Sequence, residues 1–567
     1  MLPSLNWRPA SLLTITLACG FVTSSRANPI AHSSHNIIES VPDLPNLDEW
    51  IADEADIALD ALLENIHPPD TLPGVVVASP SRKDPDYFYH WTRDAALVLS
   101  VAQMVYEHGV DNGGAKDTML ENILWNYARF EQHLQTVPNP SSNIAEPKWN
   151  VDGTAYTLPW GRPQNDGPAL RAQTLTLFAQ SHLRKHQNTS LITSLLYDSR
   201  FPSSSLIKNN LEFTSHNWQE DTVDLWEEIR GTHFYTLMVQ HSSLVHGSRF
   251  AEEMGDIGAA RWYAAQSRKI ASKLEEHWSP EHRILQSTLS RTGGIGYKSS
   301  NLDVSILLAS LHTDPPSLFD HPRHPFMPHP HFLHTPYPPW SDEVLSTAMK
   351  LDHVMSSLYP INNITNVNDL PIANAIGRYP EDRYDGIGTS SLGNPWFLTT
   401  LAYAEVLYRT AVEWSHQNWI PVTDVTLDLL KWIGAFHPNS TNPHSHTAEI
   451  GKYAISRVPV RRAHSPVLFD WIIKHLGKKA DAYFRRVQLH ALGRESGKMA
   501  EQINRVDGKM QGARSLTWSH AAFVTAVVAR DKFLGSLEGE VGEGMGRYTL
   551  GDQRRFASLK LQLLKKR

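Results

Sequence analysis

The segment 221–231, Asp-Thr-Val-Asp-Leu-Trp-Glu-Glu-Ile-Arg-Gly, places three of its four carboxylates within two residues of one tryptophan. The adjacent side chains of Glu227 and Glu228 point in different directions, so one can face a substrate while the other holds it. A carboxyl group beside the indole of Trp226 and near the like charge of Asp224 is expected to have a raised pKa, which a general acid requires. The other interpretation is a set of charges at a helix N-terminus that interacts with the helix dipole.

A second candidate carboxylate is Glu501, in Met-Ala-Glu-Gln-Ile-Asn at 499–504. A glycine-containing loop follows it and leads to Leu-Thr-Trp-Ser at 516–519, which contains Trp518. Such an arrangement can hold a general base against a water molecule. A solvated glutamate on a helix is the alternative.

Three further segments combine aromatic rings with an arginine and a carboxylate. They are Asp-Tyr-Phe-Tyr-His-Trp-Thr-Arg-Asp at 86–94, Trp-Gly-Arg-Pro-Gln-Asn-Asp-Gly at 160–167 and Gly-Arg-Tyr-Pro-Glu-Asp at 377–382. Arg93 and Asp94 are adjacent and can bind neighbouring hydroxyls of one sugar. Rigid aromatic faces suit the apolar C–H faces of sugars. Together these groups predict a neutral ligand with many hydroxyls.

Helical periodicity dominates the elements that must position these residues. Apolar residues from Leu47 to Ile66 recur at helical spacing, and Pro68-Pro69 ends that helix. Further helices are expected near 94–108, 120–134, 168–184, 232–254, 256–277, 343–358, 396–414, 422–435 and 516–534. The best strand candidate is the short segment 74–79. The chain is therefore predicted to be all-α.

Each polar motif lies in a loop that runs directly into an apolar helix. These loops are 84–94, 149–167, 221–231, 377–395 and 501–517. Repeated units with chemistry in equivalent loops predict a ring of helices with one functional rim. The repeats then belong to one large domain, although a length of 567 residues alone would suggest three or four domains.

Five motifs, in order, resemble those of the glucoamylases, the fungal and yeast family of starch-degrading glycoside hydrolases. They are Tyr87–Asp94, Asn150–Asp152 followed by Trp160–Gln164, Asp224–Glu228, Gly377–Asp382 with Gly393–Phe397, and Glu501-Gln502 with Leu516–Ser519. The resemblance covers residues 40–535. It implies an (α/α)6 barrel with long rim loops that form a pocket. It also implies an exo-acting, inverting hydrolase that releases β-D-glucose from the non-reducing ends of α-1,4-glucans and acts more slowly on α-1,6 bonds.

The resemblance also assigns roles to individual residues. Glu227 falls on the general acid, Glu501 on the general base and Glu228 on a substrate contact. The remaining substrate-binding positions that it implies are Tyr87, Trp91, Arg93, Asp94, Trp160, Arg162, Asp166, Gly167, Asp224, Trp226, Arg378 and Trp518. Neither a metal nor a cofactor is expected.

Some positions depart from the family pattern. Arg230 stands where filamentous-fungal members have Asn, and Gly512 where they have a Ser that hydrogen-bonds the base. His90 and His520 replace a Thr and a Tyr, and the usual disulfides and starch-binding domain are absent from this sequence. These differences bear on rate, pH optimum and raw-starch affinity, whereas the reaction type is the same.

The net charge and the N-terminal segment bear on the binding partners and the location of the protein. A net charge of −7 does not favour a polyanionic partner, so no nucleic acid is expected. Residues 1–27 resemble a secretory signal peptide and contain the single cysteine, Cys19. Sequons at Asn188, Asn363 and Asn439 agree with secretion, and a vacuolar location is the alternative.

We further expect a monomer without a membrane span, acting on oligosaccharides or polysaccharides. The catalytic domain is expected to span 28–536. It would contain a Pro- and His-rich surface insertion at 313–340, and a short tail at 537–567 would follow it.

Two alternatives to a glucoamylase remain open. The first is a related helical-barrel α-glucosidase of the trehalose or isomaltose type. The second is a catalytically dead glucan-binding protein, which the presence of both carboxylates disfavours.

Overall fold

The computed structural model describes residues 44–107, 115–187, 189–200, 205–313, 335–437, 446–493 and 495–538. Several predicted features lie outside the described residues: the signal peptide 1–27 with Cys19, the sequons at Asn188 and Asn439, most of the 313–340 insertion, and the tail beyond residue 538. Asn363 is described, and its side chain is exposed.

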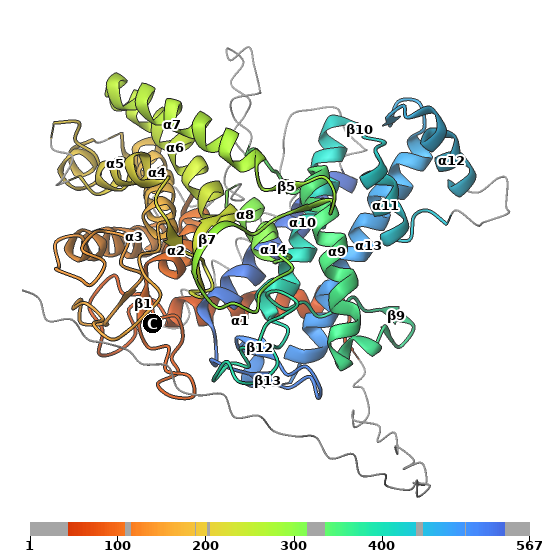
Figure 1. Ribbon diagram of the computed structural model, residues 1–567, viewed down its shortest axis with the longest axis horizontal. Coiled ribbons are helices and arrows are strands. Elements are labelled where there is room, and N and C mark those ends of the chain that lie inside the picture. Colours follow the sequence, from red (N-terminus) through yellow and green to blue (C-terminus); the bar gives the residue numbers. More distant parts are fainter. Residues whose placement is uncertain are drawn as a thin grey trace, which may run out of the picture. The chain divides into compact units, whose positions relative to one another are not determined.

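Six helices of the described chain form a closed inner ring, in which each helix packs against the next and the last against the first. They are α2 (Thr92–Glu107), α4 (Asp166–His186), α6 (Phe234–Glu253), α8 (Ser305–His312), α10 (Phe397–Gln417) and α14 (Thr517–Glu538). Figure 1 labels all six, with α2, α4 and α6 on the left and α8, α10 and α14 nearer the centre.

A second helix precedes each inner helix in the sequence and packs outside the ring. These helices are α1 (Leu47–Glu64), α3 (Ala115–Leu134), α5 (Leu206–Asn217), α7 (Ile257–Glu275), α9 (Asp342–Leu358) and α13 (Pro466–Ala491). The chain thus alternates between an outer and an inner helix, which is the expected (α/α)6 barrel. Two extra helices, α11 (Asp424–Trp432) and α12 (His446–Ser456), lie between α10 and α13.

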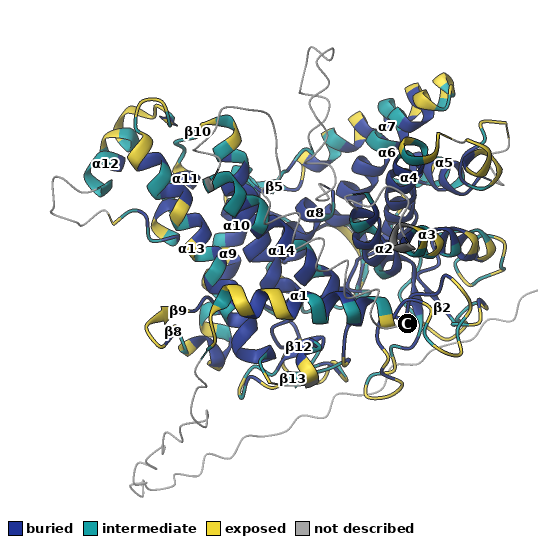
Figure 2. Ribbon diagram, turned by 180° about the vertical axis from the view of Figure 1, so that it is seen from behind, coloured by how far each residue is buried: buried dark blue, intermediate teal, exposed yellow. Residues whose placement is uncertain are grey.

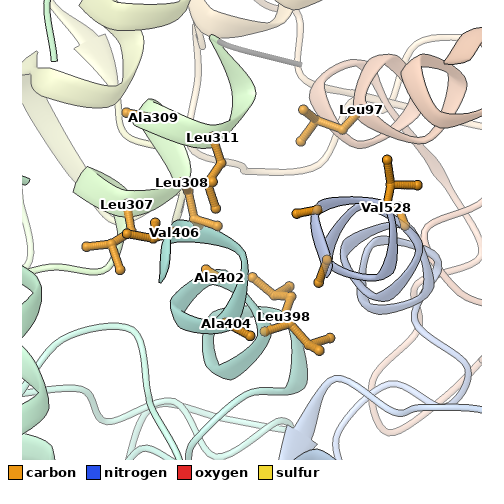
Figure 3. Close-up of a cluster of buried hydrophobic side chains, with 14 of the residues drawn as sticks. Leu97, Leu307, Leu308, Ala309, Leu311, Leu398, Ala402, Ala404, Val406 and Val528 are labelled. Atoms are coloured by element: carbon orange, nitrogen blue, oxygen red, sulfur yellow. The ribbon is translucent and has the colours of Figure 1, made fainter. Parts of the chain in front are cut away.

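The pattern of apolar residues explains which helices lie inside. The helices α4, α6 and α10 are buried on nearly every face, whereas α1, α7 and α9 have polar faces that remain exposed (Figure 2). Small and branched side chains from α2, α8, α10 and α14 fill the ring: Leu97, Leu307, Leu308, Ala309, Leu311, Leu398, Ala402, Ala404, Val406 and Val528 (Figure 3).

Caps define where several outer helices begin. The side chain of Asn46 accepts hydrogen bonds from the amides of Asp48 and Glu49 at the start of α1, and Ser341 accepts one from Val344 at the start of α9. Pro466 occupies the first turn of α13.

The strands are short and lie in the connections. The three-stranded sheet contains β3 (Thr222–Val223), β4 (Ile229–His233) and β7 (Thr288–Gly294). Antiparallel pairs are β1 (His90–Trp91) with β2 (Lys148–Trp149), β5 (Trp278–Ser279) with β6 (Ile284–Leu285), β8 (Asn366–Val367) with β9 (Leu370–Pro371), β10 (Trp419–Ile420) with β11 (Val460–Arg461), and β12 (Gln502–Ile503) with β13 (Met510–Gln511).

The predicted strand at 74–79 is wrong, because only Val76 forms an isolated bridge there, to Ile66. The neighbouring amides instead bond to separate loop carbonyls: Val77 to Asn65, and Ala78 to Tyr89. Four helices of the described chain were not among the expected ones: α5, the short inner helix α8, α12 and the 26-residue helix α13. No helix in the described ranges is long and apolar enough to cross a bilayer.

Candidate functional site

The predicted functional residues gather at the N-terminal end of the inner ring. Contacts link the first turns of consecutive inner helices or the segments that precede them: Arg93 to Asp166, Gln164 to Glu227, Trp226 to Asp303, Glu228 to Arg378, and Tyr384 to Glu501. The stacked rings of Trp226 and Trp518, 6.3 Å apart, bring in the start of α14. Most of the motifs found in the sequence therefore form one site.

Glu227 lies in a tight turn before β4, with a φ angle of 67°. Its amide donates to the carbonyl of Asp224 (2.9 Å). Its Oε1 accepts hydrogen bonds from Trp91 Nε1 (2.9 Å) and Gln164 Nε2 (3.0 Å), and Arg93 Nη2 lies 3.7 Å away. The side chain is 19% exposed. A buried set of donors thus fixes one carboxylate oxygen, while the side chain keeps access to solvent.

Arg93 connects the acidic residues on this side of the site. Its Nη1 donates to Gln164 Oε1 (2.7 Å) and to Asp166 Oδ2 (3.1 Å), and its Nε lies 3.5 Å from Asp94 Oδ2. Burial raises the pKa of Asp94 to about 6, and Glu227 and Asp166 add to this, whereas Arg93 opposes it. Arg93 Nε is buried and makes no hydrogen bond, although it faces the Asp94 carboxylate.

Glu228 faces the other side of the site and pairs with Arg378. Arg378 Nη2 donates to Glu228 Oε1 (2.8 Å), and the hydroxyl of Tyr379 donates to Glu228 Oε2 (2.7 Å). Asp382 accepts two hydrogen bonds from the same guanidinium, at 2.8 and 2.6 Å. The adjacent glutamates 227 and 228 therefore point in different directions, as expected from their sequence.

Asp224 and Trp226 hold the turn in place. Asp224 Oδ1 accepts from the amides of Glu228 (2.8 Å) and Ile229 (3.0 Å), and its Oδ2 lies 3.7 Å from Lys298 Nζ. The sequence predicted that this charge acts on the neighbouring catalytic carboxyl group, but the observed partners of Asp224 are backbone amides and a lysine. Burial alone would raise the pKa of Asp224, but Lys298 and the backbone donors lower it. Trp226 Nε1 donates to both oxygens of Asp303 (3.0 and 3.1 Å), at the start of α8.

Glu501 lies on a short loop just before β12 and is 1% exposed. Its Oε2 accepts from Tyr384 OH (3.3 Å) and from the amide of Ala513 (3.4 Å). The hydroxyls of Tyr384 and Tyr87 are 2.8 Å apart. Burial raises the pKa of Glu501 to about 8, against the lowering effect of Ala513, Tyr87, Arg378 and Tyr384.

Aromatic rings line the side of the site next to Glu227. The ring of Trp91 lies 5.4 Å from that of Tyr87 and 5.9 Å from that of Trp160. Lys148 Nζ is enclosed by four rings, at 3.7 Å from Trp160, 4.2 Å from Tyr89, 4.3 Å from Tyr156 and 4.4 Å from Trp91. Burial lowers the pKa of Lys148 to about 8, and Glu227 opposes this.

Several predicted residues serve the scaffold. Arg162 Nε donates to Glu146 (3.0 Å), and its other nitrogens donate to the carbonyls of Leu158 and Tyr156. Gly167 allows α4 to approach α2, because a Cβ atom there would lie 3.0 Å from Thr92 Cγ2. We expected both as substrate contacts, but their observed contacts are internal.

The positions that depart from the family pattern also contact protein groups. Arg230 donates to the carbonyls of Asp221 and Arg162, at 3.2 and 2.8 Å. His90 Nε2 lies 3.0 Å from Glu131 Oε1, and His520 Nε2 lies 3.1 Å from Ser515 Oγ. At Gly512, whose φ is +75°, a Cβ atom would lie 2.3 Å from Glu501 Oε2.

Sequence reasoning missed Gln164, Tyr384, Lys148 and Asp303 as site residues. Gln164 lies inside a segment that we singled out, and Tyr384 lies two residues after another. Lys148 and Asp303 carry no local signal, because their neighbours come from distant segments. Away from this site, Glu121, His182 and His186 form a group of three potential metal ligands within the described part of the chain.

Comparisons with known proteins agree with this arrangement. The model of the family "Glycosyl hydrolases family 15" matches residues 56–528. The chain is 36% identical to glucoamylase 1 of Rhizopus oryzae over 85% of this chain and 71% of that protein. It is 31% identical to an intracellular, sporulation-specific glucoamylase of Saccharomyces cerevisiae, over 87% and 85%. The solved glucoamylase from Saccharomycopsis fibuligera superposes with a TM-score of 0.73 at 27% identity, covering 87% of this chain and 97% of that one.

Proposed function

Because the chain belongs to glycosyl hydrolase family 15 and acts as an exo-acting glucan 1,4-α-glucosidase, we propose that Glu227 and Glu501 supply the acid and base of its reaction. Glu227 protonates the oxygen of the bond that breaks. Glu501 removes a proton from the water that attacks the glucose carbon from the opposite face. The product is then β-D-glucose, with inversion at that carbon.

The contacts of Glu227 support its role as the acid. Trp91 and Gln164 both donate to Oε1, which leaves Oε2 as the oxygen to carry the proton. The Glu227 side chain is 19% exposed, so a substrate that enters from solvent can reach it. Positioned proton transfer of this kind contributes about 10²–10⁴-fold to a rate.

The contacts of Glu501 support its role as the base. The donors Tyr384 and Ala513 orient Oε2, and hydrogen bonds to the ionised form favour it. Burial raises its proton affinity, which strengthens a base once it has ionised.

The groups between the two glutamates fit one glucose ring. Asp94 offers a carboxylate with the guanidinium of Arg93 beside it, and such a pair suits neighbouring hydroxyls. Trp160 Nε1 is likewise buried without a partner. Trp91, Trp160 and Trp518 offer ring faces for the C–H surface of the sugar.

The observation that carries the proposal is the path of contacts between the two carboxylates. Glu227 bonds to Trp91, the ring of Trp91 contacts Tyr87, and Tyr87 bonds to Tyr384, which bonds to Glu501. Both carboxylates thus border one site. We predict that their oxygens lie about 6.5–9.5 Å apart, the separation typical of inverting enzymes.

The test compares Glu227→Gln and Glu501→Gln with the exposed control Glu276→Gln, whose side chain is 57% exposed. We expect both site variants to lose about 10²–10⁴-fold in kcat on maltose while KM changes little, because the lost interaction belongs to the transition state. The control should match wild type. Initial release of α-glucose, or near-normal turnover by either site variant, would overturn the assignment.

Substrate range and compartment extend the proposal. We expect turnover to be fastest on soluble starch and maltodextrins, slower on isomaltose and negligible on trehalose, which a four-substrate assay measures.

Secretion with removal of residues 1–27 is supported by the N-terminal apolar run, and the exposed Asn363 is available as a glycosylation site. Because one relative is named intracellular, peptide mass spectrometry of the N-terminus in medium and vacuole is the deciding measurement. Gel filtration tests the expected monomer.

A further inference from the structure

Three side chains with metal-ligating atoms meet between α3 and α4, far from the site described above. His182 and His186 are four residues apart on α4, which places them on one face of the helix. Glu121 reaches them from α3. His182 lies 16 residues after Asp166, so this cluster is about 24 Å along α4 from the residues that surround Glu227.

The geometry of the cluster resembles a set of ligands around one point. His182 Nδ1 lies 3.0 Å from Glu121 Oε1, and His186 Nε2 lies 3.1 Å from Glu121 Oε2. One ligand atom from each residue lies within 4.8 Å of the others. Atoms bound tetrahedrally to Zn²⁺ at about 2.0–2.1 Å are about 3.3 Å apart. Small side-chain movements would therefore bring all three into coordination.

The burial of one imidazole adds to this geometry. The His182 side chain is 5% exposed, yet its Nδ1 makes no hydrogen bond despite its approach to Glu121. Buried polar atoms normally have a partner. A metal ion bound to both atoms would take the place of the proton that otherwise lies between Nδ1 and Glu121 Oε1, 3.0 Å apart.

The surroundings favour a bound cation. The cluster lies in the last turns of α4, where the negative end of the helix dipole attracts positive charge. The nearby cationic side chains point elsewhere, because Arg184 pairs with Glu107 and Lys185 donates to the carbonyl of Tyr106 (2.6 Å). Trp125 Nε1 lies 3.4 Å from Glu121 Oε1 and orients that carboxylate.

We propose that Glu121, His182 and His186 bind a divalent transition metal ion such as Zn²⁺, which links α3 to α4. Two imidazoles and one carboxylate suit Zn²⁺ and its neighbours in the first transition row, whereas Ca²⁺ and Mg²⁺ prefer oxygen ligands. His186 is 44% exposed, so water can complete the coordination. The ion would stabilise the fold, since a ligand that binds the native state shifts unfolding, and it would leave the hydrolysis of maltose unaffected.

The test is calorimetric titration of zinc chloride into the EDTA-treated, dialysed protein. His186→Gln and Glu121→Gln each remove one ligand from a partly exposed position, so the variants should fold. His216→Gln is the matched control, because His216 also lies near a glutamate four residues away, Glu212 (3.6 Å), and is 57% exposed. Wild type and the three variants all contain the Pro- and His-rich 313–340 segment, so zinc bound there contributes equally to all four titrations.

We expect wild type and His216→Gln to bind one more equivalent of Zn²⁺ than the other two variants, or to bind that equivalent at least 10-fold more tightly. Zinc should raise the Tm of wild type more than that of His186→Gln, and Co²⁺ should give the visible absorption of a tetrahedral site only in wild type and the control. Equal stoichiometry and affinity in all four proteins would overturn the proposal, as would a wild-type protein that binds no zinc.

Discussion

Replacing Gly512 with alanine tests whether the position of the Glu501 carboxylate limits catalysis. A Cβ atom at this position would lie 2.3 Å from Glu501 Oε2, whereas ordinary contact begins at 3.4 Å. The carboxylate must therefore move by about 1 Å, because atoms do not pack closer than van der Waals contact. This movement breaks its bonds to Tyr384 and Ala513. A misplacement of about 1 Å can cost about 10²-fold in rate.

We expect kcat/KM of Gly512→Ala on maltose to fall about 10²-fold, measured from initial rates of glucose release. Gly434→Ala is the matched control, because Gly434 has the same φ of +75° and no atom within 4 Å of an added Cβ. A left-handed φ costs an alanine about 1–2 kcal/mol, so urea unfolding should show similar losses of stability in both variants. If Gly512→Ala kept the kcat/KM of Gly434→Ala, the steric reasoning would be refuted.

Three further substitutions test other features of the structure. Trp91→Phe removes the N–H that donates to Glu227 at 2.9 Å, and initial rates on maltose should show a loss of about 10-fold to 100-fold in kcat/KM. Tyr384→Phe removes a donor that lowers the pKa of Glu501. The pKa of that carboxyl should then rise, and the acidic limb of the kcat/KM profile should shift up by about 0.5–1 pH unit. Glu54 is 2% exposed, and burial raises its pKa to about 8. The protonated form of Glu54 contributes its full stabilisation below the pKa that this group has in the unfolded chain, and the contribution is lost as the pH rises towards 8. Between pH 5 and pH 8 the free energy of unfolding of wild type should therefore fall by roughly 2–4 kcal/mol more than that of Glu54→Gln, as measured by urea unfolding.

Controls and contrary outcomes differ for each substitution. The control is Tyr453→Phe, which removes a hydroxyl on α12 that bonds to Ser465, the residue before α13 (2.7 Å), and its pH profile should match wild type. A profile of Tyr384→Phe that also matches would mean that this hydroxyl does not tune the base. Unchanged kcat/KM in Trp91→Phe would remove the support for an oriented Glu227. The same pH dependence in Glu54→Gln and wild type would assign that dependence to other groups.

Local signals in the sequence predicted the helices and the positions of the motifs. Apolar periodicity marks α1 and α2 because each must bury a face against neighbours. Motifs that directly precede apolar helices indicated one rim, which the contacts of Arg93 and Glu228 confirm. The strand predicted at 74–79 was wrong because a strand needs a partner, and a single segment does not specify its partner.

What the sequence alone determined is therefore ten of the fourteen described helices, their order, and the loops that carry polar and aromatic residues. Only the tertiary structure decided which of those residues face the site. Arg93 and Arg162 both lie in motifs with aromatic and acidic neighbours, yet Arg93 reaches Glu227 while Arg162 binds Glu146 and backbone carbonyls. Tyr384 approaches Glu501 from 117 residues away. The physical reason is that a side chain's hydrogen-bond partners and burial depend on how the ring of helices closes, and closure brings together residues whose proximity no local pattern specifies.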